Sequence, residues 1–494
     1  MTHSTSRTDQ EPHVQGYDPR TGEPVGAPVP ATSAAEVDRI CADLDATASV
    51  WAGTSREGRA RALEAVAVAL DAHSDELAGL ADAETALGMP RLTGEVARTT
   101  GQLRLFAEVL REGAYLGRVV EPAAEGRPDL RRVKQPTGLV AVFAASNFPF
   151  AFSVAGGDTA SALAAGCPVV VKAHEAHPGT SRRTAELVKA ALAEVGAPPV
   201  FDIVHGFAAG AAVIGHPAVT AVGFTGSTRG GLALARLCAE RPVPVPFHGE
   251  LGSVNPVVVL PGAARSRAAE VASGYAASLT QGVGQFCTNP GLMFVPDDAS
   301  LMGALAESVA GTDGGPMLSA RIHDAWAAAV AELRGRDDVR VLAEGRPGKG
   351  PWAATPTVFA VDGAAYDRAP EVFGQERFGP VGVVVVDGDA DRTRTRLGGV
   401  EGSLTVSVQL DRDRPEDIEA ARALLPVAAR RAGRLVVNGW PTGVAVTRAQ
   451  HHGGPFPAST SPAHTSVGGA AIDRWLVPVA YQDVPSELLP PELR

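Results

Sequence analysis

The chain has 494 residues, 45% of them hydrophobic and 20% charged, which is ordinary for a globular protein and enough for more than one domain. Its net charge of −11 argues against nucleic acid as a partner, because phosphate binding needs a basic stripe. The four cysteines lack metal-site spacing and disulfide density, and the polar first 24 residues lack an apolar signal core. We therefore expect a cytoplasmic protein without a metal.

The first third of the chain predicts helices. Residues 34–50 and 55–85 are alanine-rich with helical periodicity and residues 91–116 continue as a long helix, so we expect an all-helical opening. Residues 136–157 then form an uncharged run long enough to span a membrane. Because Asn147, a proline and two adjacent glycines interrupt this run, a buried strand, a loop and a helix start are favoured, and no membrane partner is expected.

From residue 138 onward, short aliphatic runs alternate with helical stretches, which is typical of a parallel, doubly wound sheet. Strands are expected in "GLVAVFAAS", "PVVVK", "VFDIVHG" and "AVGFTGS". The alternation resumes after residue 250, with strands in "GLMFVP" and "GPVGVVVVDG", so we place a domain boundary there. The final run "AIDRWLVPVAYQDV" predicts a strand that needs a partner outside its own domain.

Cys287 lies in "QGVGQFCTNPGL", a turn-prone segment, whereas a structural cysteine normally lies among aliphatic residues. A nucleophilic role requires its thiolate or a nearby base. Thr288 and Asn289 are expected to leave their backbone N–H groups free to face a developing oxyanion. From this segment alone two interpretations stay open, a catalytic cysteine and an exposed turn.

Two further polar residues lie where catalysis is plausible. Glu250, in "FHGELGS", stands before an apolar stretch, where burying a carboxylate is costly unless it is used; it could equally be a surface glutamate at a strand start. Asn147, in "AASNFPF", follows an apolar strand at the edge where doubly wound sheets bind ligands. Its amide can donate to an oxyanion, or it can simply form the turn before Pro149.

Other motifs suit a nucleotide. Lys172 ends a predicted buried strand, with Glu175 three residues later, and can reach hydroxyls or phosphates or form a solvated strand end. Gly226 and Ser227 offer backbone N–H groups at a helix start, which suits a pyrophosphate, although the G-x-G-x-x-G pattern is absent. Glu376 stands just before another predicted buried strand.

Six motifs, "SNFP", "VVVK", "GFTGS", "ELGS", "GQFCTNPG" and "ERFGP", follow one another in the order and spacing of a known family. From "YDPRTGEP" to the C-terminus the chain resembles the aldehyde dehydrogenase superfamily. The resemblance implies that Cys287 is the nucleophile, Glu250 the general base and Asn147 the oxyanion donor.

The same resemblance implies an α/β fold with two doubly wound parallel-sheet domains and a bridging hairpin. We expect a dinucleotide-binding domain at residues 1–120 and 138–249, a catalytic domain at 250–470, and a bridging or oligomerisation element at 121–137 and 471–494. A homodimer or homotetramer is implied as well, because a lone edge strand is an aggregation hazard unless it is paired.

The cofactor implied by the resemblance is NAD or NADP. Lys172 and Glu175 are expected at its adenosine ribose. Gly226 and Ser227 are expected at its pyrophosphate, and Glu376 and Phe378 at its nicotinamide end. Glu371 is a second E-x-F-G candidate, but only Glu376 is followed directly by Pro380 and the strand. Because the Glu175 carboxylate repels a 2′-phosphate, we expect NAD, although relatives in one branch often carry a neutral residue here and accept NADP.

That branch, the 2,5-dioxopentanoate (α-ketoglutarate semialdehyde) dehydrogenases, is indicated by "KAHEAHPGTS", "RTTGQLRLFAE" and "QHHGGPFPASTSPAHTSVGG". It implies oxidation of this aldehyde to 2-oxoglutarate through a cysteine thiohemiacetal and thioester. Arg98 and Gln102 share a face of a helix that resembles one lining the substrate tunnel, unless that face is merely solvated. Phe148 is expected at the substrate because the usual "PWN" is "ASN" here. Medium-chain or aromatic aldehydes, a coenzyme A-dependent acylating enzyme and a non-catalytic relative are the alternatives.

Overall fold

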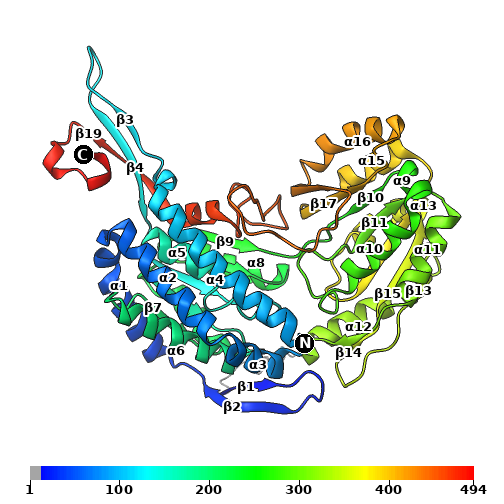
Figure 1. The fold of residues 1–494 in the computed structure, drawn as a ribbon, viewed down its shortest axis with the longest axis horizontal. Coiled ribbons are helices and arrows are strands. Elements are labelled where there is room, and N and C mark those ends of the chain that lie inside the picture. The colour runs from blue at the N-terminus through cyan, green and yellow to red at the C-terminus, as the bar shows by residue number, and fades with distance from the viewer. Residues whose placement is uncertain (1–12) are drawn as a thin grey trace, which may run out of the picture.

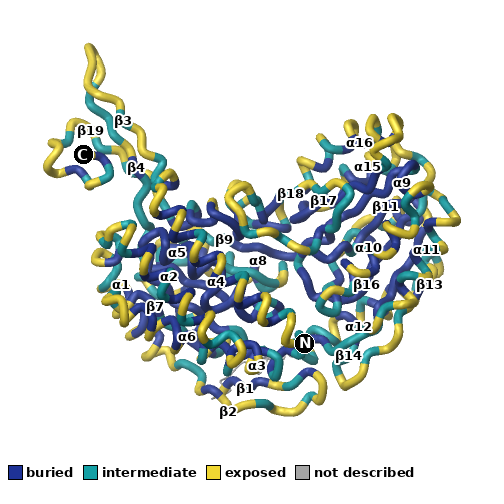
Figure 2. Tube along the Cα trace, in the orientation of Figure 1, coloured by how far each residue is buried: buried dark blue, intermediate teal, exposed yellow. Residues whose placement is uncertain are grey.

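The structure is a computed structural model that describes residues 13–494. Two α/β bodies lie side by side, and a narrow arm projects from the N-terminal one (Figure 1). Buried residues fill the interior of both bodies, whereas the arm is mostly exposed or half-buried (Figure 2). The arrangement places the end of one sheet opposite the loops of the other.

A short hairpin precedes the first helices. Its strands are antiparallel, β1 (His13–Tyr17) and β2 (Pro24–Pro30). Helices follow where they were expected, but the stretch 55–85 divides at His73, which gives four: α1 (Ala34–Gly53), α2 (Arg56–Ala72), α3 (Ser74–Thr85) and α4 (Met89–Glu112). Ser33 and Ser55 cap α1 and α2, and Gly113, at φ 75°, ends α4. The prediction of an all-helical opening was wrong, because the hairpin strands are too short and too exposed to give a clear alternating pattern.

The first body is built on a parallel five-stranded sheet of order β7-β6-β5-β8-β9. Its strands are β5 (Leu139–Phe143), β6 (Val169–Lys172), β7 (Phe201–Val204), β8 (Val219–Thr225) and β9 (Phe247–Glu250). The helices between them are α5 (Gly157–Ala165), α6 (Pro178–Glu194), α7 (Phe207–Gly215) and α8 (Thr228–Ala239). The chain builds outward from β5 through β6 and β7, then crosses to β8 and β9. The crevice beside β5 is therefore the topological switch point, where such sheets bind ligands.

The second body is built on a seven-stranded sheet of order β13-β15-β16-β11-β10-β17-β18. All pairs are parallel except the edge pair of β13 with β15. Its strands are β10 (Val257–Val259), β11 (Leu292–Val295), β13 (Arg340–Glu344), β15 (Thr357–Asp362), β16 (Val381–Val386), β17 (Ser403–Gln409) and β18 (Ala432–Val437). A two-stranded ribbon joins β12 (Gly315–Pro316) to β14 (Ala353–Ala354). The predicted α/β class with two wound sheets is confirmed.

The helices of the second body cover both faces of its sheet. They are α9 (Pro261–Ser266), α10 (Ala268–Thr280), α11 (Ala299–Ala310), α12 (Ala320–Arg334), α13 (Gly363–Arg368), α14 (Pro370–Phe373), α15 (Ala390–Gly399) and α16 (Pro415–Ala428). One hydrophobic cluster lies on each face, one centred on Phe294 and Phe359 and the other on Tyr275 and Met293. The successive residues Met293 and Phe294 of β11 thus point to opposite faces, as the two-residue period of a strand requires.

The arm is a three-stranded antiparallel sheet of order β19-β4-β3. Its strands are β3 (Val119–Glu121), β4 (Leu130–Pro136) and β19 (Leu476–Gln482), and Val479 pairs with Val133. The expected tail strand therefore finds its partner far away in sequence, although residues 469–475 form a 3-10 helix rather than strand. Among residues 13–494, no helix combines the length and apolar character needed to cross a membrane.

Candidate active site

The loop that carries Cys287 connects α10 to β11 and turns through three successive left-handed residues, Gly282, Val283 and Gly284. A side chain at Gly284 would collide with the backbone of Gly379, so only glycine fits there. Asn255, just before β10, clamps the loop from below, since its Nδ2 donates to the Cys287 carbonyl at 2.8 Å and to the Asn289 carbonyl at 3.0 Å. The cysteine is therefore held by backbone geometry rather than by packing.

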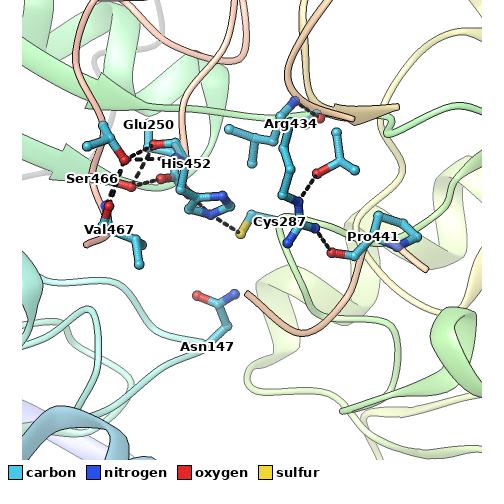
Figure 3. Close-up of polar contacts among 12 residues, drawn as sticks. Asn147, Glu250, Cys287, Arg434, Pro441, His452, Ser466 and Val467 are labelled. Atoms are coloured by element: carbon cyan, nitrogen blue, oxygen red, sulfur yellow. Dashed lines mark hydrogen bonds and ion pairs between the residues drawn. The ribbon is translucent and has the colours of Figure 1, made fainter. Parts of the chain in front are cut away.

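Cys287 faces a histidine and a glutamate from distant segments (Figure 3). Its Sγ lies 3.7 Å from His452 Nε2, and that nitrogen lies 3.1 Å from Glu250 Oε1. Glu250 ends β9, and its second oxygen accepts a hydrogen bond from the Ser466 hydroxyl. His452 and Glu250 are only 1% and 4% exposed. A nucleophile, an imidazole and a carboxylate are thus lined up in a nearly dry environment.

This environment sets the protonation of the thiol and the carboxyl. Burial raises the pKa of Cys287 well above its ordinary value, and the negative charges of Glu250 and Glu376 raise it further. Burial also acts to raise the pKa of Glu250, but His452, Ser466 and the thiol outweigh it and leave that pKa below its ordinary value. The resting site therefore pairs a protonated thiol with an ionised carboxylate.

Asn147 lies in the loop after β5, at the switch point, and its amide is directed toward the space beneath Cys287 (Figure 3). Its Nδ2 donates one hydrogen bond to the Gln285 carbonyl at 3.0 Å, which leaves the second N–H available. Within residues 13–494, the Cys287 N–H donates to no backbone acceptor, whereas the Asn289 N–H bonds the Phe286 carbonyl at 3.0 Å. The expectation of a free Asn289 amide was wrong, because that residue closes the turn.

A cavity of about 470 Å³ leads to the thiol and is lined by Cys287, His452 and the N-terminal half of α4. Arg98 lines it, with its guanidinium 5.9 Å from the ring centre of Phe148 and 5.3 Å from that of Phe152. Burial lowers the pKa of Arg98 while the negative charge of Glu95 opposes the shift. A cation is thus held against aromatic faces beside the nucleophile.

Arg91, about two turns earlier on α4, stacks between Phe148 and Phe286 at 5.2 and 4.8 Å. Its Nη2 also donates to the Asn147 carbonyl at 2.6 Å. This bond ties the wall of the cavity to the residue beneath the thiol.

Gln102, by contrast, does not line this cavity. It is 4% exposed and points at Gly157, where an added Cβ would lie 2.6 Å from its Nε2. Arg98 and Gln102 share a face of α4, but α5 covers that face from Gln102 onward.

The proposed nucleotide residues lie along the carboxyl edge of the first sheet. Lys172, the last residue of β6, bonds Glu175, and its ammonium lies 4.8 Å from the ring centre of Phe207, which is 70% exposed. Ser227 caps α8 by accepting from the Gly230 N–H at 3.2 Å. The Gly226 N–H is not free as expected, because it donates to the Glu250 carbonyl at 3.1 Å.

Glu376 is the residue of this row that we expect at the nicotinamide end. Burial raises its pKa to about 7, and its carboxyl approaches Gly252 so closely that an added Cβ there would force the Glu376 and Thr228 side chains to move. The Gly252 N–H bonds Thr228 Oγ1 at 3.1 Å, which joins this loop to the start of α8. Phe378 is half-buried two residues after Glu376. A side-chain-free cradle, a helix start and a carboxyl for hydroxyl groups fit a dinucleotide.

Sequence reasoning missed several residues of this site. His452, Ser466, Asn255 and Arg91 all make the contacts described above, yet they are far apart in the chain. The only available signal for His452 was the unusual pair "HH" before two glycines in a C-terminal segment otherwise poor in charge. No spacing rule connects it to Cys287, 165 residues earlier.

Comparison with known proteins gives one consistent result. Residues 6–455 match the profile of the "Aldehyde dehydrogenase family". The chain is 46% identical to alpha-ketoglutaric semialdehyde dehydrogenase 2 of Azospirillum brasilense, over 97% of this chain and 93% of the relative. It is 38% identical to alpha-ketoglutaric semialdehyde dehydrogenase of Acinetobacter baylyi, over 98% and 93%.

Solved structures agree on the fold. An aldehyde dehydrogenase mutant from Pseudomonas syringae, in complex with NAD⁺ and octanal, superposes with a TM-score of 0.82 at 24% identity, covering 98% of this chain and 96% of that one. Gamma-glutamyl-gamma-aminobutyraldehyde dehydrogenase from Burkholderia cenocepacia gives the same TM-score and identity, covering 95% and 93%.

Proposed function

The chain belongs to the aldehyde dehydrogenase family and oxidises an aldehyde to a carboxylate with NAD(P); we propose that its substrate is 2,5-dioxopentanoate and its product 2-oxoglutarate. The observation that carries the proposal is the guanidinium of Arg98 in the cavity that leads to Cys287. An aldehyde with a carboxylate at its far end would be oriented by that cation. The names of the two relatives support the same substrate.

In the proposed first step, Cys287 Sγ attacks the aldehyde carbon. The resting thiol is protonated, so its proton must leave as the C–S bond forms, and His452 Nε2 at 3.7 Å is the nearest acceptor. The Glu250 carboxylate stabilises the imidazolium that results. The Asn147 amide and the Cys287 N–H hold the oxyanion of the thiohemiacetal, and losing one such donor typically costs about 2.7–4 kcal/mol of barrier.

The second half of the proposed reaction converts the thiohemiacetal to the acid. NAD(P), when bound, supplies the chemistry of hydride acceptance. Lys172, Glu175, Ser227, Glu376 and Phe378 would hold it along the edge of the first sheet. Once the hydride has left, a thioester remains on Cys287, and Glu250 activates a water that hydrolyses it. The ionised state of Glu250 at neutral pH suits a base.

We further propose a division of labour between the two bodies. Residues 1–120 and 138–249 bind the dinucleotide, residues 250–470 carry the nucleophile, and residues 121–137 with 471–494 assemble a homodimer or a dimer of dimers. Support comes from the arm, where β19 is an edge strand with an exposed Val477. A cytoplasmic location is supported by four cysteines that are all free.

A medium-chain or aromatic aldehyde is a second candidate, since Phe148, Phe152 and Phe286 also line the cavity. The deciding experiment is Arg98→Ala, read as kcat/KM for 2,5-dioxopentanoate and for an uncharged aldehyde of the same length. We expect KM for the oxo-acid to rise at least about tenfold and that for the uncharged aldehyde to change little, since a charge-assisted contact is worth about 1.5–3 kcal/mol. Equal effects on both substrates would assign the cavity to apolar aldehydes.

A further inference from the structure

The three reactive side chains of the site also form a set of metal ligands. Cys287 Sγ, His452 Nε2 and one carboxylate oxygen of Glu250 all lie within 4.8 Å of one another. Thiolate, imidazole and carboxylate are the ligands that zinc takes in proteins, commonly three at a time with a fourth position left open. The sequence alone does not reveal this site, because Glu250 and Cys287 are 37 residues apart and Cys287 and His452 are 165 residues apart.

The spacing is close to that of a zinc tetrahedron. With a Zn–S bond of about 2.3 Å and Zn–N and Zn–O bonds near 2.0–2.1 Å, sulfur and nitrogen ligands lie about 3.6 Å apart, and nitrogen and oxygen ligands about 3.4 Å. The corresponding distances here are 3.7 Å from Sγ to Nε2 and 3.1 Å from Nε2 to Oε1. The third pair, Sγ and a Glu250 carboxylate oxygen, lies within 4.8 Å, so a side-chain rotation that shortens this distance would place one ion between all three atoms.

A second observation concerns Glu250 Oε1. This oxygen is buried and, in the described part of the chain, accepts no well-directed hydrogen bond, although His452 Nε2 is 3.1 Å away. The two atoms therefore approach without pointing at each other. The other carboxylate oxygen is fixed by the Ser466 hydroxyl, the kind of outer contact that orients a metal-ligating carboxylate.

An ion can reach the three atoms through the substrate cavity. Cys287 and His452 both line that cavity of about 470 Å³, and Glu250 lies behind them. The fourth position of a tetrahedral ion would face the cavity and hold a water. Arg98, which also lines the cavity, adds no ligand of its own.

We propose that Cys287, His452 and Glu250 form a zinc-binding site through which Zn²⁺ reversibly inhibits the enzyme. The Zn–S bond replaces the S–H bond, the thiol proton passes to solvent, and no electron is transferred. The cation withdraws charge from the bound sulfur and blocks the approach of the aldehyde to it, and the glutamate no longer activates water. The consequence for inhibition rests on the proposed roles of these residues, but the binding itself does not.

The binding test uses the apo full-length chain with Zn²⁺ in competition with a chromophoric chelator, and with Co²⁺ as a spectroscopic probe. We expect one high-affinity ion per chain and a cobalt spectrum with the intense bands of a tetrahedral thiolate site. Cys287→Ser should remove the thiolate band, and His452→Gln should weaken Zn²⁺ binding at least about tenfold. His323→Ala, at a partly exposed histidine on α12, is the matched control and should bind as the wild type does.

The inhibition test adds buffered free Zn²⁺ to the assay of wild type and His323→Ala. We expect competition with the aldehyde, unchanged dinucleotide binding by fluorescence quenching, and full recovery with EDTA. The inference is overturned if Zn²⁺ stoichiometry is the same in Cys287→Ser, or if bound Zn²⁺ leaves turnover intact. If the wild type binds Zn²⁺ with the thiolate signature but oxidises no aldehyde, the zinc site stands and the proposed function fails.

Discussion

At the scale of single residues, the site combines groups whose charges oppose one another. The thiol that must ionise is partly buried and lies near the negative charges of Glu250 and Glu376, which keeps it protonated at rest. A protonated thiol is a poor target for oxidants and alkylating agents. The arrangement therefore postpones ionisation to the moment when an aldehyde and the oxyanion donors are in place.

This arrangement predicts the alkylation behaviour of Cys287. Because the Glu250 charge helps to raise the thiol pKa, Glu250→Gln should lower the pH of half-maximal iodoacetamide reaction by at least about one unit. Labelling followed by mass spectrometry of the Cys287 peptide measures this midpoint. Glu371→Gln, at the exposed glutamate that shares the E-x-F-G pattern, is the control and should leave the midpoint unchanged. An upward shift in Glu250→Gln would mean that the carboxylate instead promotes the thiolate.

We also expect the choice of dinucleotide to depend on one residue. Glu175 bonds Lys172, so a 2′-phosphate here would meet a carboxylate and would find the lysine already engaged. At about 4 Å the repulsion is roughly 4 kcal/mol at an effective dielectric near 20, before relaxation. We expect NAD to be preferred, and Glu175→Thr to shift the ratio of kcat/KM values toward NADP at least about tenfold by removing the charge and freeing Lys172. A wild-type preference for NADP, or an unmoved ratio, would contradict this assignment.

At the scale of elements, one helix and one strand have roles beyond packing in the core. Helix α4 contributes Arg91 and Arg98 to the substrate cavity, and its buried Glu95 accepts hydrogen bonds from the Phe150 and Ala151 N–H groups at 2.9 and 3.0 Å. Those two residues follow Asn147 in the same loop. One helix thus shapes both the wall of the cavity and the backbone of the expected oxyanion donor.

The second element is β19. It lies at the outer edge of the arm with Val477 45% exposed, so its unpaired edge and apolar side chain are available to another copy of the chain. We expect Val477→Asp to weaken or abolish the oligomer, as measured by light scattering across a micromolar concentration series. Val68→Asp, at a residue of α2 that is 62% exposed, should leave the assembly intact. A wild type that is monomeric at these concentrations would refute the proposed assembly.

At the scale of the whole molecule, the C-terminal segment locks onto the first body beneath the active site. Arg474 donates to Asp158 of α5 at 2.7 Å, and Trp475 packs edge-on against His248 of β9 at 5.3 Å between ring centres. Burial, with the charges of Arg474 and His464, lowers the pKa of His248 to about 3. A partly buried histidine held in its neutral form therefore lies within β9, the strand that ends in Glu250.

This histidine predicts acid sensitivity. In the unfolded chain its pKa is near 6.5, so its contribution to stability is complete above that pH and is lost as the pH falls from 6.5 toward 3. Between pH 6.5 and 5 the loss is about 2 kcal/mol. We expect His248→Phe to show a smaller fall in Tm from pH 7.5 to pH 5 than the wild type, by scanning fluorimetry, with His323→Ala keeping the wild-type slope. Parallel slopes for wild type and His248→Phe would assign acid sensitivity to other groups.

The sequence by itself determined the reaction class and most of the framework. The helical stretches of the first third, the strands β5 to β8, β11 and β16 and the nucleophile loop were readable, because hydrophobic periodicity and glycine-rich turns are local signals. The other strands of the two sheets were not predicted. The hairpin β1–β2 and the 3-10 turn before β19 were not readable, because short or irregular segments carry little periodicity.

Only the tertiary structure decided which side chains meet. His452 and Ser466 join Glu250 and Cys287 because the C-terminal segment folds back over the end of β9, and no local pattern records that contact. The same is true of Gln102, which shares a face with Arg98 on the helix but is covered by α5. It is true also of the Gly226 N–H, which is not available to a ligand because it donates to the Glu250 carbonyl at the end of β9. Residue type and spacing set what each group can do, whereas the packing of distant segments sets its neighbours, its exposure to water and therefore its charge.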